Sequence, residues 1–360
     1  MRVLNFSSGP AMLPEPVLET AREEMFSYGG LGISVMELSH RSDTFAEIKN
    51  RTVASLRRLL DLREDFEVLF MSGGATMQFA AVPMNLLFKG KTAEYIITGA
   101  WSKKAAAEAE NWGKVSVIYS TEGSGFSNLP SEGEISPSPG AAYLHYTSNE
   151  TIHGVEFSYD LDAGNVPAIC DASSNMLSRP IDTSKYDLIY AGAQKNLGPS
   201  GLTVVLIRRG LLDGAARVHP RLLDYRTVAE NDSMPNTPNT WAIYISALVC
   251  EWIESLGGLA EIAKRNARKA ATVYSAIDRS EGFYRGMAEK SARSLMNITF
   301  RLPNADLEKR FIAEAADNQM IGLAGHRSLG GIRASMYNAF PTKGAEILAD
   351  FMDDFARRYG

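Results

Sequence analysis

Apolar positions recur along the chain in two patterns, short buried runs and longer runs with helical spacing. The first helical run covers residues 15–28 and ends at Gly29-Gly30, and the second covers residues 42–60, where Ser42 or Asp43 can cap its start. After residue 65, short apolar runs alternate with helical runs, which is typical of an α/β fold with a mostly parallel sheet. The strands expected in that sheet are residues 66–71, 93–98, 115–119, 142–146, 168–170, 188–191 and 202–207.

The pattern changes after Gly257-Gly258, where charged amphipathic helices replace the apolar ones. We therefore expect a large domain over residues 15–255 and a small α+β domain over residues 256–360. Residues 1–14 are rich in Ser, Gly and Pro, and we expect them to be irregular and to pack on or near the small domain. The elements expected in the small domain are helices at 259–277, 306–315 and 343–359 and strands at 295–301 and 332–335.

Composition narrows the class of protein. The 360 residues are 45% hydrophobic and 22% charged, and the net charge of -5 is spread without a long run of one sign. This distribution offers no surface for nucleic acid or for an anionic membrane. No apolar run reaches the ~18 residues of a membrane span, and the N-terminus has no signal-peptide core, so we expect a cytoplasmic protein. Cys170 and Cys250 lie in apolar runs and are expected to be buried free thiols.

One lysine stands where chemistry is expected. Lys195 follows the apolar run 188–191 and enters a loop that contains Gly198 and Gly201. A free lysine has a pKa near ~10.4 and is a poor nucleophile at neutral pH, but burial lowers that pKa. Small neighbours leave room for a flat ring, so Lys195 is a candidate for Schiff-base chemistry. A strand-end lysine that simply reaches solvent is the commoner arrangement, so the surrounding residues must decide.

Three further features favour pyridoxal 5′-phosphate (PLP) as the ring. Asp171 ends the preceding strand, and a carboxylate there could keep the pyridine nitrogen protonated, so that the ring withdraws electrons. The turn at residues 72–76 joins a strand to a helix and offers free backbone amides to a phosphate. Trp101 follows another strand and could stack on the ring. Taken singly, these residues could equally be a helix cap, a tight turn and a core aromatic.

Arginines supply the candidate anion sites. Two His-Arg pairs, His40-Arg41 and His326-Arg327, together with Arg333, suit a substrate with several anionic groups. Any one of these arginines could instead be a solvated surface charge. The histidines lack metal-ligand spacing, so no metal is expected. No GxGxxG or GxSxG motif is present, which argues against a dinucleotide enzyme and an α/β-hydrolase.

Six segments resemble the phosphoserine aminotransferase family, namely residues 5–14, 37–42, 78–85, 148–154, 193–201 and 325–328. They occur in order over nearly the whole chain. The resemblance implies a PLP-dependent transferase of fold type I, in the class V aminotransferase group, that works as a homodimer. It also implies transfer of the amino group of L-glutamate to 3-phosphohydroxypyruvate, which gives O-phospho-L-serine and 2-oxoglutarate in serine biosynthesis.

The resemblance assigns cofactor roles position by position. Lys195 would hold the cofactor covalently and then move the proton between substrate and cofactor. Asp171 would pair with the pyridine nitrogen, Trp101 would stack on the ring, and Thr151 would hydrogen bond near the ring hydroxyl. The cofactor phosphate would be held by Ala75, Thr76 and Gln194 and, across the subunit interface, by Asn239 and Thr240.

The same resemblance assigns residues to the substrate anions, with Arg333 the best candidate for the α-carboxylate. One position departs from part of the family, because Thr76 stands where some members have an arginine. This change leaves the balance of cationic groups around the cofactor phosphate open. The full set implied for substrate binding is Ser8, His40, Arg41, His326, Arg327 and Arg333.

Two other class V activities remain as alternatives. A serine–glyoxylate or alanine–glyoxylate aminotransferase would share the cofactor residues, but the His-Arg pairs favour a phosphorylated substrate. A cysteine desulfurase needs a reactive cysteine on a mobile loop, and the candidate loop, residues 320–333, contains none. Some family members also aminate a four-carbon phosphorylated oxo acid in PLP biosynthesis, and the sequence does not decide whether this chain does.

Overall fold

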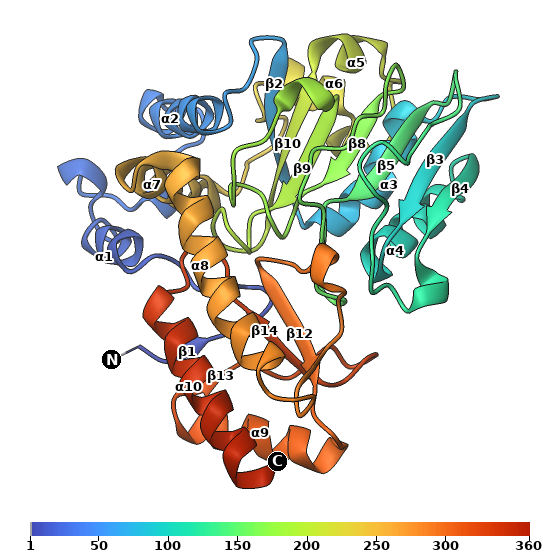
Figure 1. Ribbon diagram of the computed structural model, residues 1–360. Coiled ribbons are helices and arrows are strands. Elements are labelled where there is room, and N and C mark those ends of the chain that lie inside the picture. Colours follow the sequence, from blue (N-terminus) through green and yellow to red (C-terminus); the bar gives the residue numbers. More distant parts are fainter. Residues whose placement is uncertain (1) are drawn as a thin grey trace.

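The computed structural model describes residues 2–360, and Figure 1 shows an upper part built on a large sheet and a lower part that ends the chain. Within these residues the large sheet has seven strands, of which only β10 runs antiparallel to its neighbours. The expected α/β class with a mostly parallel, mixed sheet is therefore confirmed. In spatial order the strands are β2 (Phe66–Ser72), β10 (Leu202–Arg208), β9 (Leu188–Gly192), β8 (Ala168–Asp171), β5 (Tyr143–Thr147), β3 (Thr92–Ile97) and β4 (Lys114–Ser120).

Helices cover both faces of this sheet. The central strands are apolar on both sides, because successive side chains point to opposite faces and each face meets a helix layer. In β10, Val204 and Leu206 belong to one core, whereas Val205 and Ile207 belong to the other. The first core is covered by α2 (Asp43–Leu59) and α7 (Thr240–Ser255), and the second by α3 (Gln78–Leu86), α4 (Ala100–Ala109), α5 (Arg209–Gly214) and α6 (Tyr225–Glu230).

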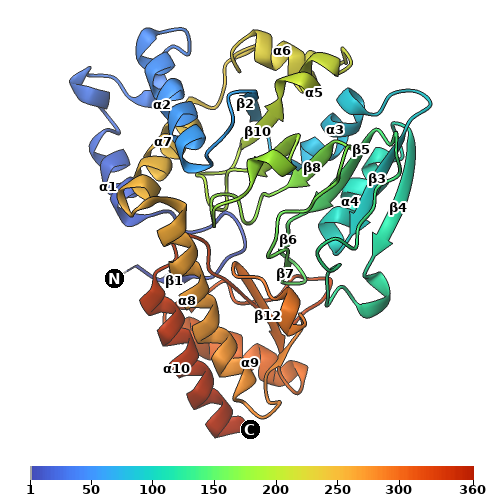
Figure 2. The ribbon, with the colours of Figure 1, turned by 45° about the horizontal axis from the view of Figure 1, so that its top comes forward.

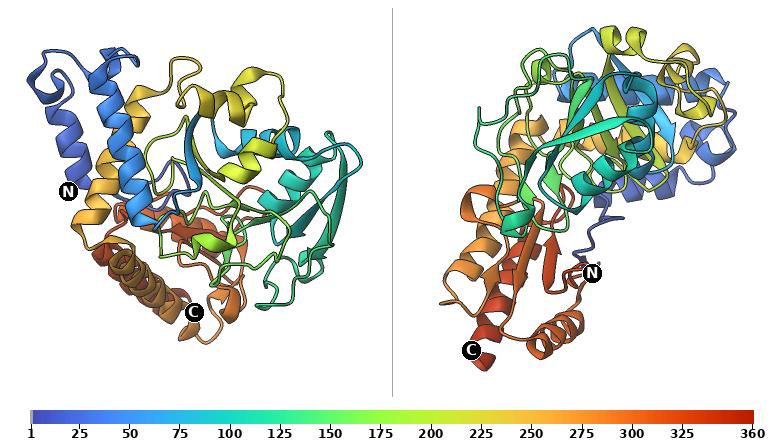
Figure 3. Two further views of the ribbon diagram at one scale, coloured as in Figure 1. Left: turned by 90° about the horizontal axis from the view of Figure 1, so that it is seen from above. Right: turned by 90° about the vertical axis from the view of Figure 1, so that its right-hand side faces the viewer.

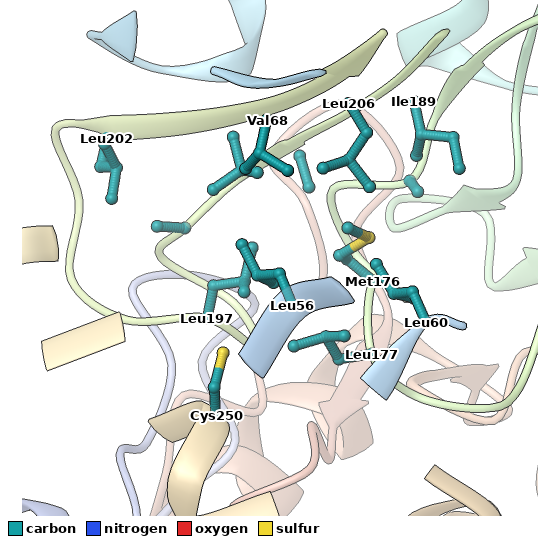
Figure 4. Close-up of a cluster of buried hydrophobic side chains, with 14 of the residues drawn as sticks. Leu56, Leu60, Val68, Met176, Leu177, Ile189, Leu197, Leu202, Leu206 and Cys250 are labelled. Carbon is teal, nitrogen blue, oxygen red and sulfur yellow. The ribbon is translucent and has the colours of Figure 1, made fainter. Parts of the chain in front are cut away.

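Figure 4 shows part of the first core, where Leu56 and Leu60 at the end of α2 lie beneath Val68 and Leu206 of the sheet. The start of α2 is as expected, since the Ser42 hydroxyl accepts a hydrogen bond from the Phe45 amide at 3.2 Å. This cap is one that serine makes well, because its side chain satisfies a helical amide that has no backbone partner.

The first helix is shorter than the sequence pattern predicts. α1 covers Glu15–Glu23, whereas the expected helix reached residue 28. The following segment contains only the short turns η1 (Tyr28–Gly30) and η2 (Val35–Glu37). Gly29, Gly30 and Gly32 have positive φ angles that a helix cannot contain, and they make the chain turn toward α2. Figure 2 shows α1, α2 and the segment between them at one edge of the molecule.

The lower part has its own core around a small sheet of β11 (Arg285–Gly286), β12 (Asn297–Arg301) and β14 (Ile332–Ser335). The N-terminal segment joins it, because β1 (Leu4–Asn5) pairs with β13 (Met320–Ile321) and Phe6 is fully buried there. Residues 4 and 5 were expected to be irregular, and their strand arises from a partner more than 300 residues away. The helices of this part are α8 (Gly258–Asp278), α9 (Ala305–Asp317) and α10 (Thr342–Tyr359).

Figure 3 shows from two further directions that this lower part extends to one side of the large sheet. The chain enters it between α7 and α8, where Gly257 and Gly258 both have positive φ angles. The domain boundary at residues 255 and 256 stays a prediction. Within residues 2–360 no single helix is long and apolar enough to cross a membrane; α7 and α8 pass that test only together and are bent by 84°.

A short hairpin that the sequence pattern did not predict joins the two parts. It consists of β6 (Asn149–Glu150) and β7 (Val155–Glu156), which directly follow β5. It contacts the small sheet through a side chain and through its turn, since Asn149 Nδ2 donates to Asn297 Oδ1 at 2.8 Å and Thr299 Oγ1 donates to the backbone carbonyl of His153 at 2.8 Å. Strands of two residues carry no detectable period, so the hairpin is visible only in the fold.

Candidate active site

The carboxyl ends of β2, β3, β5, β8 and β9 lie at the same edge of the large sheet and enclose a cavity of about 230 Å³. Open α/β sheets bind their ligands at this edge. The lower part and the N-terminal segment close the other side of the cavity. Ten of the predicted site residues line it, namely Ser8, Ala75, Thr76, Trp101, Thr151, Asp171, Gln194, Lys195, His326 and Arg333.

Lys195 lies on the loop after β9, and its Nζ donates a hydrogen bond to Thr151 Oγ1 at 3.0 Å. Burial lowers the pKa of Lys195 to about 8, although the negative charges of Asp171 and Glu150 oppose this, while Arg333 lowers it further. At pH 7 roughly a tenth of such an amine is neutral, far more than for a lysine in water. The amine is therefore available as a nucleophile and a base.

Asp171 ends β8 and is 4% exposed. Burial raises the pKa of its carboxyl group, whereas hydrogen bonds from Ser173 and the charge of Lys195 oppose that rise. The Ser173 amide donates to Asp171 Oδ1 at 2.9 Å, and no lysine or arginine among residues 2–360 forms an ion pair with it. A buried carboxylate without an ion-pair partner gains most from a cation placed opposite it. A protonated ring nitrogen would be such a cation.

Behind Asp171 lies a buried row of polar aromatic side chains that the sequence analysis missed. Tyr190 pairs in register with Asp171, and its hydroxyl lies 2.8 Å from His145 Nε2. The His145 ring stacks on Tyr95, whose hydroxyl is 2.9 Å from that of Tyr143. Burial lowers the pKa of His145 to about 3, so the imidazole is neutral. The available signal was a histidine between two tyrosines in an otherwise apolar run, which sequence alone cannot orient.

The turn after β2 is shaped for an anion. Gly73 has a φ of 96°, a backbone conformation that residues with a Cβ rarely adopt, so glycine is strongly favoured there. The short helix that follows, η3 (Ala75–Met77), has no side-chain cap, which leaves its first amides free to face the cavity. Gln194 lines the cavity as well, and its Oε1 is buried without a hydrogen-bond partner in residues 2–360.

The lower part contributes cationic groups to the opposite wall. Arg333 on β14 donates from Nη2 to Ser8 Oγ at 2.7 Å, and Tyr337 donates its hydroxyl hydrogen to the Ser8 carbonyl at 2.8 Å. The N-terminal segment is thus an integral part of the site. His326 lies nearby, and its Nδ1 is 2.7 Å from Ser328 Oγ.

The remaining predicted residues do not line the cavity of their own chain, namely His40, Arg41, Asn239, Thr240 and Arg327. Arg41 and Arg327 are exposed. Asn239 caps α7, because its side chain accepts a hydrogen bond from the Ala242 amide at 3.0 Å. Within its own chain, the Asn239 side chain therefore serves as a helix cap.

Comparison with known proteins agrees with this geometry. The sequence model of the class V aminotransferases matches residues 3–348. The phosphoserine aminotransferase of Stenotrophomonas maltophilia (strain R551-3) is 50% identical over 359 residues, which cover 100% of this chain and 99% of that protein. The chain belongs to the class V aminotransferase family.

Solved structures of relatives place this aminotransferase more closely. Phosphoserine aminotransferase from Bacillus circulans subsp. alkalophilus superimposes with a TM-score of 0.98 at 47% identity, over 100% of this chain and 99% of that chain. PLP-bound phosphoserine aminotransferase from Trichomonas vaginalis superimposes with a TM-score of 0.91 at 38% identity, over 98% of this chain and 100% of that chain. The expected fold of the PLP-dependent class V aminotransferases is therefore confirmed.

The cavity of this aminotransferase fits a flat, polar cofactor. Several buried polar atoms of its lining residues have no hydrogen-bond partner within residues 2–360, which is costly unless a ligand or water supplies one. They combine donors and acceptors around one small volume, as a ring with a phosphate and a hydroxyl requires. These atoms are Trp101 Nε1, Thr147 Oγ1, Asn149 Oδ1, Gln194 Oε1 and Arg333 Nε.

The depressed pKa of Lys195 can be measured directly in the apoprotein. We expect the rate at which a small acylating reagent modifies Lys195 to rise with pH. Its midpoint should lie near pH 8, about two pH units below that of an ordinary lysine. Asp171→Asn should lower that midpoint further, because the negative charge of Asp171 raises the pKa of Lys195. Mass spectrometry of the Lys195 peptide gives the rate, and a midpoint above 10 in both proteins would contradict the burial argument.

Proposed function

We propose that this chain is a phosphoserine transaminase that moves the amino group of L-glutamate to 3-phosphohydroxypyruvate through bound PLP. The observation that carries the proposal is a single cavity that holds a lysine with a lowered pKa, a buried carboxylate and the guanidinium of Arg333. The curated relatives that match over the full chain support the choice of substrates, since they are phosphoserine aminotransferases. The products are O-phospho-L-serine and 2-oxoglutarate.

Different residues around the cavity would bind different parts of the cofactor. Lys195 would hold the cofactor covalently, the Asp171 carboxylate would pair with its ring nitrogen, and Trp101 would cover its ring. The free amides of Ala75 and Thr76, with Gln194, would receive its phosphate, and Thr151 would bind near its ring hydroxyl. The chemistry that PLP supplies when bound is electron withdrawal from the substrate Cα and exchange of the amino group.

Lys195 is also the proton carrier. Once the substrate amino group has displaced Lys195 from the cofactor, the released amine would take the proton from the substrate Cα and return it at the carbon that receives the amino group. The Thr151 hydroxyl accepts a hydrogen bond from Nζ and would fix its position. Burial keeps this amine uncharged often enough to act near neutral pH. Glutamate and the phosphorylated oxo acid are processed in turn in the same cavity, so one set of side chains serves both.

Substrate anions meet the cationic wall. Arg333 is held by Ser8 and receives the α-carboxylate through its planar guanidinium, which binds carboxylates with paired hydrogen bonds. His326 and Arg327 lie on the loop before β14 and receive the second anionic group, the phosphate of one substrate or the side-chain carboxylate of the other. Thr76 adds no positive charge to the turn that would receive the cofactor phosphate. The backbone amides and Gln194 would therefore bind the phosphate without the arginine that some relatives have at this position.

The cysteines argue against the desulfurase alternative. Cys170 and Cys250 are both buried free thiols, and neither lines the cavity. Burial raises the pKa of Cys170 to about 12, so its thiol is not a nucleophile at neutral pH. Buried free thiols are also what a reducing compartment preserves, and the cytoplasm remains the expected location.

The chain works as a homodimer in this proposal. Four exposed apolar side chains in the segment between α1 and α2 support it, namely Phe26, Leu31, Ile33 and Met36. Phe26 is 87% exposed, which is unusual for a large apolar side chain unless it meets a partner. This segment is followed by His40 and Arg41. A subunit interface formed here would place both residues at the cavity of the partner subunit. Asn239 and Thr240, at the start of α7, reach the cofactor phosphate of the partner subunit in the same way.

The proposed reaction is tested by assaying glutamate with 3-phosphohydroxypyruvate beside pyruvate, glyoxylate and the four-carbon phosphorylated oxo acid. We expect kcat/KM for 3-phosphohydroxypyruvate to exceed those for pyruvate and glyoxylate by at least about 100-fold, since only it satisfies both anion sites. Lys195→Ala should remove turnover and the borohydride-reducible link to PLP. Preference for glyoxylate would favour the alternative transaminase, and normal turnover by Lys195→Ala would refute the lysine assignment.

Arg327→Ala tests which group meets the phosphate. We expect kcat/KM for 3-phosphohydroxypyruvate to fall by about tenfold or more, because a charge-assisted hydrogen bond is worth roughly 1.5–3 kcal/mol. The value for unphosphorylated hydroxypyruvate should change less than about threefold. Arg265→Ala removes an exposed arginine of α8 and is the matched control, expected to leave both values unchanged. Equal losses for both substrates would exclude Arg327 from phosphate recognition.

Mixed dimers test whether Asn239 acts across the interface. Lys195→Ala and Asn239→Ser are each expected to be impaired as homodimers, and serine is chosen because it also caps helices well. When the two are co-expressed, one site of each mixed dimer joins an intact Lys195 to the intact Asn239 of the partner subunit. Activity should then rise toward half of the wild-type value per mixed dimer. If Asn239 acted within its own chain, no intact site would form and mixing would restore nothing.

A further inference from the structure

Glu150 is a fully buried carboxylate outside the predicted site residues. It accepts three hydrogen bonds from the first turn of α4: from the Trp101 amide at 3.0 Å, the Ser102 amide at 2.7 Å and the Ser102 hydroxyl at 2.7 Å. Burial raises the pKa of Glu150, and these hydrogen bonds from Ser102 and Trp101 oppose the rise. A carboxylate at a helix N-terminus is favoured, since the free amides and the helix dipole attract negative charge.

The hairpin that carries Glu150 directs its neighbours to the other side. Asn149 and Thr151 line the cavity, whereas Glu150 does not. Thr151 accepts the hydrogen bond of Lys195, and Glu150 accepts a hydrogen bond from the Trp101 amide. Two adjacent residues, the end of β6 and the start of the turn after it, therefore contact the lysine and the tryptophan of the site.

The residue before α4 is adapted to this contact. A Cβ on Gly99 would lie 2.4 Å from Glu150 Cδ, so any other residue at this position would displace the carboxylate. On the solvent side Lys104 Nζ lies 4.4 Å from the centre of the Trp101 ring. Glu150 thus fixes the backbone of Trp101, and the ammonium group of Lys104, also on α4, contacts the indole ring.

We propose that Glu150 is a positioning residue for Trp101: its carboxylate fixes the first turn of α4 so that the indole is presented to the cavity. The proposal concerns the geometry of the apoprotein. It rests on the proposed function only for its consequence, which is tighter binding of the flat cofactor that Trp101 covers.

The hairpin provides a matched control in Glu156, a buried carboxylate on the opposing strand that is 5% exposed. Glu156 accepts hydrogen bonds from the Leu295 amide at 2.7 Å and from Asn175 Nδ2 at 3.1 Å, and none from α4. Glu150→Gln and Glu156→Gln therefore remove the same buried charge from the same hairpin. Only the first presents an amide NH₂ to the Trp101 and Ser102 donors.

The experiment labels the apoprotein with 5-fluorotryptophan and records ¹⁹F NMR spectra of its four tryptophans. Trp101→Phe identifies the Trp101 resonance. In Glu150→Gln we expect that resonance to shift or split while those of Trp112, Trp241 and Trp252 keep their positions. In Glu156→Gln all four should stay unchanged. An unshifted Trp101 resonance in folded Glu150→Gln, or an equal shift in both variants, would overturn the proposal.

A second readout follows PLP binding by quenching of the protein fluorescence. The apparent Kd should rise about tenfold or more in Glu150→Gln and less than about twofold in Glu156→Gln. If Glu150→Gln does not fold, Ser102→Ala replaces it, because it removes one of the three contacts and should move the Trp101 resonance by a smaller amount. A Trp101 shift without any change in PLP affinity would retain the positioning role and refute the role of Trp101 in covering the cofactor, which separates the two proposals.

Discussion

The removal of two ionisable groups from water, Lys195 and Asp171, is the constraint around which the site is built. Burial shifts the pKa of each group in the direction that favours its neutral form, and the opposite charge of the other group partly offsets that shift. The sheet makes this arrangement possible, since both residues follow neighbouring parallel strands and therefore reach the same edge. The helices on both faces of the sheet support the strands that hold these two groups in place.

Much of the site could be predicted because its chemistry is local in sequence. An apolar strand, a lysine and small residues occur together at 188–201, and the phosphate turn at 72–76 has its glycines beside its helix. What could not be predicted depends on distant partners. The hydrogen bond between Arg333 and Ser8 spans 325 residues, and Glu150 reaches the start of α4 across 48 residues. A glutamate between polar neighbours reads as a surface residue, and only the fold shows that it is buried.

The lower part is attached behind the site by a buried polar network that limits how it can move. The backbone amide of Asn338 donates to Asn196 Oδ1 at 2.9 Å, and its side-chain Nδ2 donates to the Leu177 carbonyl at 2.7 Å. Asn266 of α8 is fully buried and donates from Nδ2 to the Ser178 carbonyl at 3.1 Å. Separating the two parts here would leave buried groups unpaired, at about 1–3 kcal/mol each. The loop at 326–330 makes its hydrogen bonds within the lower part, for example that from Arg301 Nη2 to the Leu329 carbonyl.

The charges of that wall bear on the preference that we propose for a substrate with two anions. The pKa of His326 is lowered by its partial burial and by the positive charges of Arg333, Lys104 and Arg327. Partial burial and these positive charges therefore favour the neutral form of His326. An anion bound beside His326 would oppose the effect of these charges and favour the imidazolium. In the proposed function this coupling would favour a substrate with two anionic groups over a small oxo acid with one carboxylate.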